Sequence, residues 1–270
     1  MGKRFLRGSA AVVAVLAVSA APASAKLRSH GDLLKLRANT NQSSNWFGYN
    51  QGSLELGGKL FHSISGDWTV PTATQHRSGQ AESSSDWIGV GGGCVDAKCM
   101  VGDNTLIQTG TEQDVSSAGK ASYGAWWEVI PGPSLIINKT VSRGDHMHAD
   151  ITEAVANSNV WKITLKDVTK NWTFTQTVPY SSTHATAEWI EETPLLIGTN
   201  AGFAALPNLT NPAFTLAKTN GANANLQTSE EMQLIDSNTS KVIGTPSAPD
   251  SDTDGFGLCS WATSCSAPGS

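Results

Sequence analysis

The sequence predicts an all-β fold, an antiparallel sandwich in which two large sheets stack on each other. The clearest sign is segment 160–167, Val-Trp-Lys-Ile-Thr-Leu-Lys-Asp, in which apolar and polar residues alternate strictly. A short polar turn separates it from segment 171–178, which also alternates, so the two predict a β-hairpin. Segment 145–151 alternates as well, and no sustained helical period appears beyond residue 37.

Further strand signals are spread along the rest of the chain. They cover residues 58–70, 104–111, 121–130, 186–192 and 229–243, with turn residues between them. Many short strands separated by turns favour an antiparallel sandwich over a helical or mixed fold. Roughly ten to fourteen strands are expected in one domain, and two stacked sheets accommodate that number best.

The N-terminus predicts export. Basic residues stand at the start, an apolar run covers 10–21, and Ala23-Ser24-Ala25 supplies small residues for cleavage. This pattern is typical of a secretory signal peptide, and the run is too short for a membrane span of about 20 residues. We therefore expect residues 1–25 to be removed, and the mature protein to be secreted, extracellular and free of the membrane.

The rest of the chain reads as a short arm followed by one domain. Residues 26–42 are basic with leucines among the cations, which predicts a pro-segment or an N-terminal arm. Residues 43–270 form the β-sandwich domain, because no low-complexity linker divides them. The whole chain has 18 basic and 23 acidic residues. This acidic balance, without a basic patch, argues against a nucleic-acid partner, and we expect a monomer.

Four cysteines remain in the expected mature chain: Cys94, Cys99, Cys259 and Cys265. An even number in an exported protein predicts disulfides. We expect the local pairs Cys94–Cys99 and Cys259–Cys265, because each closes a short loop of mostly small residues. The rival interpretation is a four-cysteine zinc site, which is disfavoured because exported domains usually oxidise such cysteines.

A carboxylate and an amide stand in unusual surroundings near the middle of the chain. Glu128 lies within Tyr123-Gly-Ala-Trp-Trp-Glu-Val-Ile-Pro131, where a lone buried charge is costly. Gln108 lies between apolar residues in Leu106-Ile-Gln-Thr-Gly110. An ionised carboxylate can take a proton from water as a general base, and an amide can orient that water and donate to an oxyanion. The two residues are therefore a candidate catalytic pair, with an ordinary polar pair in a sheet as the alternative.

Other motifs accompany these two segments in a definite order. They are Ser44-Asn-Trp-Phe-Gly-Tyr49, Gly66-Asp-Trp-Thr-Val-Pro71, Ser85-Asp-Trp-Ile-Gly-Val-Gly-Gly92 and Ala187-Glu-Trp-Ile-Glu-Glu192. In order and distance the segments together resemble the glutamic peptidases, also called eqolisins or family G1 peptidases. The resemblance runs from Ser44 to Phe256, and the Gln-Thr-Gly and Ala-Trp-Trp-Glu segments are its most specific part.

The resemblance implies two seven-stranded antiparallel sheets, a sandwich of the concanavalin A-like or jelly-roll type, curved so that one face forms a groove. It implies an acid-acting endopeptidase that cleaves polypeptides through a non-covalent tetrahedral intermediate. By motif, Glu128 would deprotonate the water and then return the proton to the leaving amine. Gln108 would hold that water and stabilise the oxyanion. No metal, organic cofactor or covalent intermediate is expected.

A substrate groove beside the pair is implied as well. Its candidate residues are Trp46, Trp87, Gly91, Glu112, Trp126 and Glu188. Trp126 shares the strand face of Glu128 by alternation, and Glu188 belongs to the Ala-Glu-Trp-Ile segment that borders the groove in the family. Many fungal members carry Asp at the positions of Gly91 and Glu112. We therefore expect the pKa of Glu128, and the pH optimum with it, to differ from theirs.

Two other functions fit parts of the sequence. A sandwich that kept the fold and lost catalysis would bind carbohydrate or protein, although the intact pair favours an enzyme. A glycoside hydrolase would need two carboxylates facing one groove, and on sequence grounds only Glu128 is well placed. His146, His148 and Asp150 share one strand face and could chelate a metal, but such a row is more often the wet side of a strand.

Overall fold

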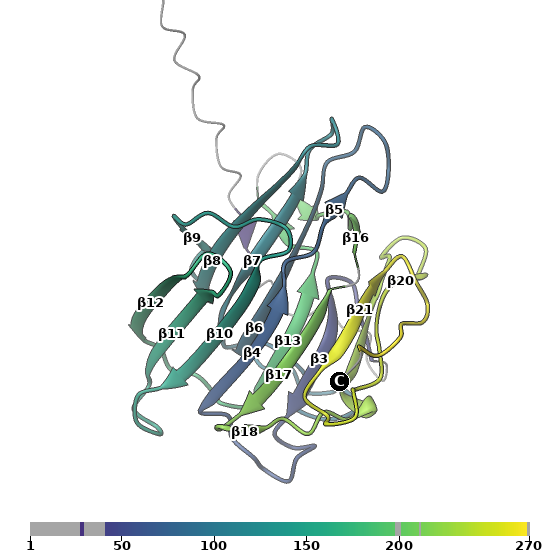
Figure 1. Ribbon diagram of the computed structural model, residues 1–270. Helices are drawn as coiled ribbons and strands as arrows, with labels where there is room; N and C mark the ends of the chain where they lie inside the picture. The colour runs from purple at the N-terminus through teal and green to yellow at the C-terminus, as the bar shows by residue number, and fades with distance from the viewer. Residues whose placement is uncertain (1–27, 30–40, 198–200, 211, 269–270) are drawn as a thin grey trace, which may run out of the picture.

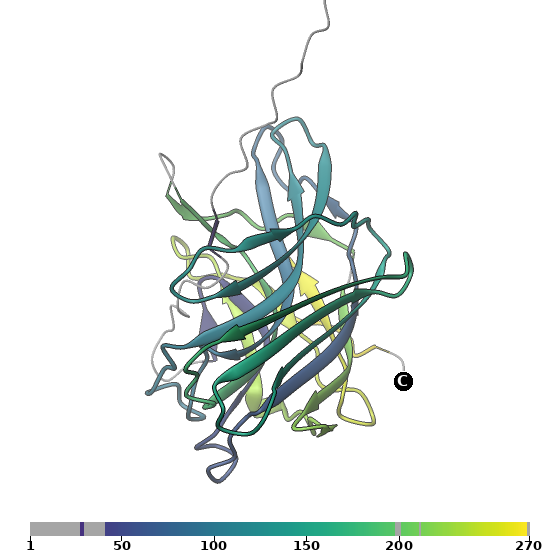
Figure 2. The same cartoon turned by 90° about the vertical axis from the view of Figure 1, so that its left-hand side faces the viewer.

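Two stacked layers of antiparallel strands make up the computed structural model, which describes residues 28–29, 41–197, 201–210 and 212–268 (Figures 1 and 2). The first layer runs in the order β19 (Glu231–Ile235), β3 (Trp46–Gly52), β13 (Thr186–Glu192), β6 (Glu82–Gly91), β7 (Leu106–Val115), β8 (Ala121–Val129) and β9 (Leu135–Ile137). The second layer runs in the order β12 (Trp172–Pro179), β11 (Val160–Asp167), β10 (His146–Glu153), β4 (Ser63–Thr69), β17 (Ala213–Thr219) and β21 (Phe256–Ser260). The predicted all-β antiparallel sandwich is confirmed.

The two layers are joined along one edge. β20 (Val242–Pro246) pairs with β21 on one side and with β19 on the other, so the layers belong to a single 16-stranded sheet. The register of β19 against β20 shifts between Leu234 and Ile235, and this irregularity accompanies the turn of β19 away from β3. The sequence predicted two separate sheets, whereas the structure joins the two layers through β20 into one sheet. Local alternation gives no information on which strand edges meet.

Short elements complete the fold. They are β1 (Arg28–Ser29), β2 (Gln42–Ser43), β5 (Ala73–Thr74), β14 (Leu195–Leu196), β15 (Gly202–Phe203), β16 (Asn208–Leu209), β18 (Ala222–Asn223) and the 3-10 turn η1 (Thr228–Glu230). β1, β14 and β15 form a small three-stranded sheet, and β16 pairs with β5.

The main apolar core lies between the layers. Trp161 and Ile163 of β11 are fully buried, as the alternation of this segment predicted. Trp189 of β13 crosses from the first layer and donates its indole N–H to the carbonyl of Ser65 in β4, at 2.9 Å. Burying each large apolar side chain stabilises the fold by about 1.5–3 kcal/mol. The same alternation leaves the opposite face of the first layer available for other side chains.

Both predicted disulfides are confirmed. Cys94 is bonded to Cys99 in the connection between β6 and β7, and Cys259 to Cys265 at the end of β21. The second bond ties the C-terminal segment to the sandwich. A four-cysteine zinc site is wrong, because all four sulfur atoms are used in these bonds.

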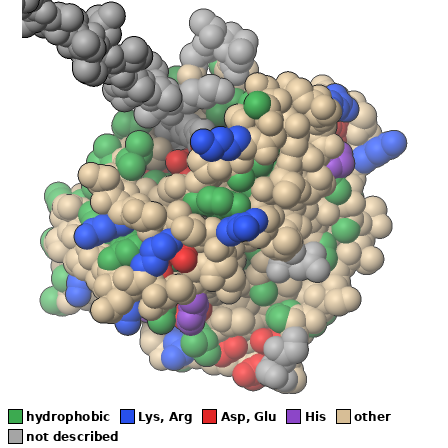
Figure 3. All heavy atoms as spheres, turned by 45° about the horizontal axis from the view of Figure 1, so that its top comes forward, with side chains coloured by type: hydrophobic (Ala, Val, Ile, Leu, Met, Phe, Trp, Pro, Cys, Tyr) green, Lys and Arg blue, Asp and Glu red, His purple; other side chains and the backbone are tan. Residues whose placement is uncertain are grey.

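The expected signal peptide, residues 1–25, lies outside the described residues, as does most of the expected arm at 26–42. Of that arm, β1 pairs with β14 and β2 pairs in parallel with β19. In the described part of the chain no helix is both long and apolar enough to cross a membrane. Figure 3 shows Lys and Arg side chains scattered singly over the face in view, without a dense basic patch there.

Candidate active site

Gln108 and Glu128 stand directly opposite each other on β7 and β8. Gln108 donates from Nε2 to Oε2 of Glu128 at 2.9 Å, and both side chains are fully buried. The two strands form a hairpin, so a short stretch of chain brings the pair together. The structure thus places the two predicted residues in contact, on the face of the first layer that points away from the second layer.

A second glutamate reaches the same face from two strands away. Gln108 lies opposite Gly89 of β6, and Gly89 lies opposite Glu188 of β13. Because neighbouring strands are about 4.8 Å apart, the backbones of Gln108 and Glu188 are roughly 10 Å apart. Gly89 between them has no side chain, and a Cβ atom there would stand 2.9 Å from side-chain atoms of Leu106 and Trp87. Glu188, Gly89, Gln108 and Glu128 thus form a row across four neighbouring strands. Within this row, Gly89 places no side chain of its own between Glu188 and Gln108.

Glu188 is fully buried and neither of its carboxyl oxygens has a hydrogen-bond partner. Burial raises the pKa of this carboxyl well above its usual value, and the nearby Thr186 hydroxyl and Gly93 amide offset the effect only in part. The carboxyl therefore holds a proton more strongly than an ordinary glutamate and has free lone pairs for a bound water or substrate. On sequence grounds Glu188 was only a groove residue.

Unsatisfied polar atoms gather on this face. Oε1 of Gln108, Nε1 of Trp87 and both carboxyl oxygens of Glu188 are buried without a hydrogen-bond partner, four of the eight such side-chain atoms among the described residues. Trp87 and Gly89 share a face of β6 by alternation, so these atoms border the same row. Buried polar atoms are normally paired. Their concentration here makes this row a candidate for hydrogen bonding to water or to ligand atoms.

The three predicted groove tryptophans pack beside this row. Trp46 and Trp87 meet edge to face, with ring centroids 4.8 Å apart. Trp46 donates from Nε1 to Oε2 of Glu192 at 3.0 Å, and Trp126 donates from Nε1 to Oγ of Ser85 at 2.9 Å. All three belong to a small apolar cluster that is separate from the main core. Their rings thus fix the walls around Gln108.

The other two predicted groove residues differ in what they contribute. Gly91 has a φ of +96°, and a Cβ atom there would lie 2.0 Å from the carbonyl oxygen of Thr105. The position therefore requires glycine and supplies no side chain. Glu112 lies opposite Gly124 of β8, on the face that also carries Gln108, and is partly buried.

A different acidic cluster lies on the inner face of the same layer, and no local sequence pattern revealed it. Gln113 donates from Nε2 to Asp86 at 3.2 Å, to both oxygens of Glu191 at 3.3 Å and to Ser84 at 3.0 Å. Burial raises the pKa of Asp86 to about 6, and burial together with Asp86 raises that of Glu191 well above its usual value. The cross-strand placement of Asp86 and Glu191 was the only signal that could have revealed it, and it requires the strand order.

The histidine row considered as a metal site is bonded to Asp67 of β4. His146 contacts one carboxylate oxygen of Asp67 at 2.8 Å and His148 the other at 2.6 Å. The carboxylate of Asp150 accepts a hydrogen bond from the hydroxyl of Thr152 at 2.8 Å. The row is therefore the wet side of β10, bonded to β4.

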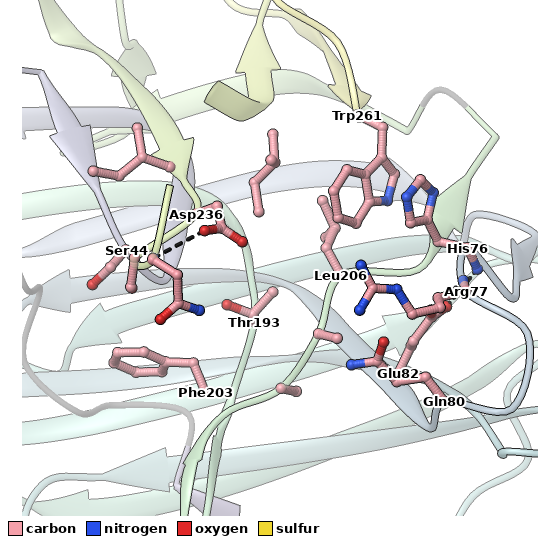
Figure 4. A pocket seen from close by; sticks show the side chains of 16 residues that line it. Ser44, His76, Arg77, Gln80, Glu82, Thr193, Phe203, Leu206, Asp236 and Trp261 are labelled. Atoms are coloured by element: carbon pink, nitrogen blue, oxygen red, sulfur yellow. Dashed lines mark hydrogen bonds between the residues drawn. The ribbon is translucent and has the colours of Figure 1, made fainter. Parts of the chain in front are cut away.

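A cavity of about 520 Å³ opens beyond the ends of β13 and β6 (Figure 4). Thr193 lines it directly after Glu192, and Glu82 anchors its rim by accepting from the backbone N–H groups of His76 and Arg77. The His76 ring stacks on Trp261 with centroids 3.6 Å apart. Along β13, Thr193 is roughly 16 Å from Glu188. The cavity is therefore outside the row that holds Gln108.

Comparison with known proteins identifies the family and the fold. The sequence model of the Peptidase A4 family matches residues 44–254. Scytalido-glutamic peptidase, solved with a transition state analog inhibitor, is similar with a TM-score of 0.62 and 19% identity over 80% of this chain and 98% of that chain. SCP-B, a member of the eqolisin family solved with the tripeptide Ala-Ile-His, gives a TM-score of 0.55 and 19% identity over the same shares. No curated protein matches the sequence. At these identities the solved structures establish the shared fold.

Proposed function

The chain belongs to the Peptidase A4 family, and on that premise we propose that it is an exported acid endopeptidase in which Gln108 and a glutamate activate the attacking water. The family makes the protein a hydrolase of polypeptides. What we propose beyond the family is that Gln108 and a glutamate activate the water, that the enzyme works best in acid, and that the protein is secreted. The observation that supports it best is the row in which Gln108 is flanked by Glu128 and Glu188 over the bare backbone of Gly89.

Gln108 is the pivot of the proposed mechanism. Its Nε2 already donates to Glu128, which fixes the orientation of the amide, and its Oε1 has no partner. A water held by Oε1 would lie on the side of Glu188, bordered by the side chains of Leu106 and Trp87 that pack beside Gly89. As the carbonyl carbon becomes tetrahedral, an amide N–H can shift towards the developing oxyanion. An amide does not titrate, so this donor persists at any pH.

Two carboxylates compete for the role of base. The sequence motif points to Glu128, and that assignment remains a prediction. The hydrogen bonding favours Glu188, because both of its oxygens are unpartnered whereas Glu128 is engaged with the amide. We propose that Glu188 takes the proton from the water and returns it to the leaving amine, while Glu128 positions Gln108. The raised pKa makes the ionised Glu188 the stronger base, and the carboxyl can act first as acceptor and then as donor at pH values near that pKa.

Cleavage of a denatured protein substrate tests the proposal across acid to neutral pH, with wild type, Glu188→Gln and Glu128→Gln compared. We expect wild type to cleave in acid, and Glu188→Gln to lose about 10²–10⁴-fold in kcat/KM. Glu128→Gln should lose less and keep a measurable rate. Asp252→Asn, at an exposed position in the connection between β20 and β21, is the control variant and should match wild type.

The outcomes separate the assignments. A larger loss in Glu128→Gln than in Glu188→Gln, with both variants folded, would return the base to Glu128. Retention of full activity in both would exclude a glutamate base on this face. A folded wild type without acid activity would favour a sandwich that binds carbohydrate or protein without cleaving it.

A further inference from the structure

We propose that His62, Glu153 and His184 form a binding site for a divalent transition-metal ion, with Zn²⁺ as its best-fitting occupant. The three residues lie in the connection before β4, at the end of β10 and in the connection before β13. One ligand atom from each lies within 4.8 Å of the others. The proposal does not depend on the peptidase mechanism.

The three side chains converge on a single oxygen. Oε2 of Glu153 is 2.7 Å from Nδ1 of His62 and 3.1 Å from Nε2 of His184. The two imidazole rings are 4.8 Å apart between centroids and inclined by 46°, so they face the carboxylate from different directions. Tetrahedral ligands with bonds of about 2.0–2.1 Å to Zn²⁺ are separated by roughly 3.3 Å. Small shifts of the side chains would therefore bring all three to bonding distance.

The backbone holds these residues together independently of the side chains. The N–H of Glu153 donates to the carbonyl of His62 at 2.8 Å, and the N–H of Phe61 donates to the carbonyl of His184 at 2.9 Å. His184 also has a φ of +59°, a conformation that only a small share of non-glycine residues adopt. The fold thus maintains an uncommon backbone geometry at the residue that turns its ring inward, as is frequent at binding sites.

The carboxylate is oriented by further donors. The N–H of Asn159 donates to Oε1 of Glu153 at 2.6 Å, and the N–H of Asn157 donates to Oε2 at 2.9 Å. Metal-binding carboxylates are commonly fixed by such hydrogen bonds, which preserve the ligand geometry when the ion leaves. Oε2 therefore remains aimed at the two rings.

The chemistry of the ligands selects the ion. Two imidazoles and one carboxylate suit Zn²⁺ and its neighbours in the first transition series, whereas Ca²⁺ and Mg²⁺ prefer oxygen ligands only. The Glu153 side chain is 0% exposed and that of His184 8%, while His62 is 28% exposed. The ion would be reached from the side of His62, where a water can complete four-coordination. Such a site would join three separate segments of the chain at one end of the sandwich.

A second histidine cluster provides an internal control. His146 and His148 bind opposite oxygens of Asp67 and are 48% and 39% exposed. Among the described residues, His146 and His148 belong to no group of three side chains whose ligand atoms lie close enough to share a metal ion. Substitution of His148 therefore changes a histidine–aspartate pair without touching the proposed ligands.

Calorimetric titration of the full-length protein with ZnCl₂ near neutral pH is the test. We expect one Zn²⁺ per chain in wild type and in His148→Asn. His62→Asn and His184→Asn should each weaken binding by about tenfold or more. Replacement of Zn²⁺ by Co²⁺ should give the visible absorption of a four-coordinate ion in wild type and not in His62→Asn. The melting temperature should rise with Zn²⁺ in wild type and His148→Asn only.

Zn²⁺ binding that is absent in wild type, or that is equally tight in His62→Asn, would overturn the proposal. His62 is partly exposed, so its Asn variant is expected to fold even if His184→Asn does not. Circular dichroism without metal checks this. The titration measures metal binding directly, so its result does not depend on whether Glu188 or Glu128 is the base in peptide hydrolysis.

Discussion

The two faces of the first layer carry nearly the same functional groups but connect them by different hydrogen bonds. On the inner face, Gln113 donates to both Asp86 and Glu191, which lie opposite each other. On the outer face, Gln108 donates to Glu128 alone, and Glu188 is left without a partner. The inner amide links two carboxyls and so stabilises the fold, although Oδ1 of Asp86 and Oε1 of Gln113 have no partner either. On the outer face neither oxygen of Glu188 is bonded, which leaves a whole carboxyl for a ligand. The comparison teaches that residue type alone does not separate structure from function.

The largest expected contrast is between the two glutamines. Gln108→Ala should lower kcat by about 10²–10³-fold, the usual loss when one oxyanion donor is removed. Gln113→Ala should leave kcat nearly unchanged and lower the melting temperature, because two buried carboxyls lose their shared donor. Steady-state kinetics and thermal unfolding of both variants measure the contrast. Equal kinetic losses in both would break the distinction between the faces.

A pH-dependent stability is expected from the inner face. Burial raises the pKa of Asp86 to about 6 in the folded protein, and that of Glu191 is also raised. An unfolded chain has ordinary values of about 3.9 and 4.3. The folded protein thus keeps protons on this pair that the unfolded chain releases. The stability that the pair contributes is therefore full below about pH 4 and falls as pH rises through about 6.

The expected fall is on the order of a few kcal/mol. Thermal unfolding measured from acid to neutral pH checks it. Glu191→Gln removes one of the two acids, and its melting temperature should decline less over this range than that of wild type. Parallel curves for the two proteins would contradict the role given to this pair.

A smaller effect is expected at Gly89. Gly89→Ala places a methyl group between Gln108 and Glu188, against side-chain atoms of Leu106 and Trp87 that lie 2.9 Å away. We expect kcat/KM to fall by about tenfold, because a misplacement in a preorganised site is costly. Gly66→Ala is the matched control: its methyl group meets Trp189 at 2.9 Å, in the main core. It should lower stability without a comparable kinetic loss.

The smallest effect is expected at Trp87. Its indole N–H has no hydrogen-bond partner among the residues that the structure describes. Trp87→Phe therefore removes a donor that the fold does not use. We expect KM to rise several-fold, corresponding to about 1 kcal/mol for one hydrogen bond to substrate. A matched Trp126→Phe change instead breaks the bond to Ser85 and should affect stability more than KM. Unchanged KM in Trp87→Phe would show that this N–H does not meet substrate.

Much of the fold could be predicted because its signals are local. The alternation of residues 160–167 is a property of one strand, and it correctly gave Trp161 and Ile163 as core. The bonded cysteines are five and six positions apart in the sequence, so their short separation was enough to predict the pairing. Gln108 and Glu128 face each other because β7 and β8 are consecutive and antiparallel. Consecutive strands usually pair, so sequence alone could anticipate their contact.

By itself, the sequence determined the all-β class, the disulfides, the family motifs and the Gln108–Glu128 pair. Only the tertiary structure decided that β13 inserts between β3 and β6, which sets Glu188 in line with Gln108. It likewise decided that His62, Glu153 and His184 converge. The physical reason is the same for both. Alternation fixes which way a side chain points along its own strand, but the neighbours of that strand follow from packing and pairing across distant parts of the chain.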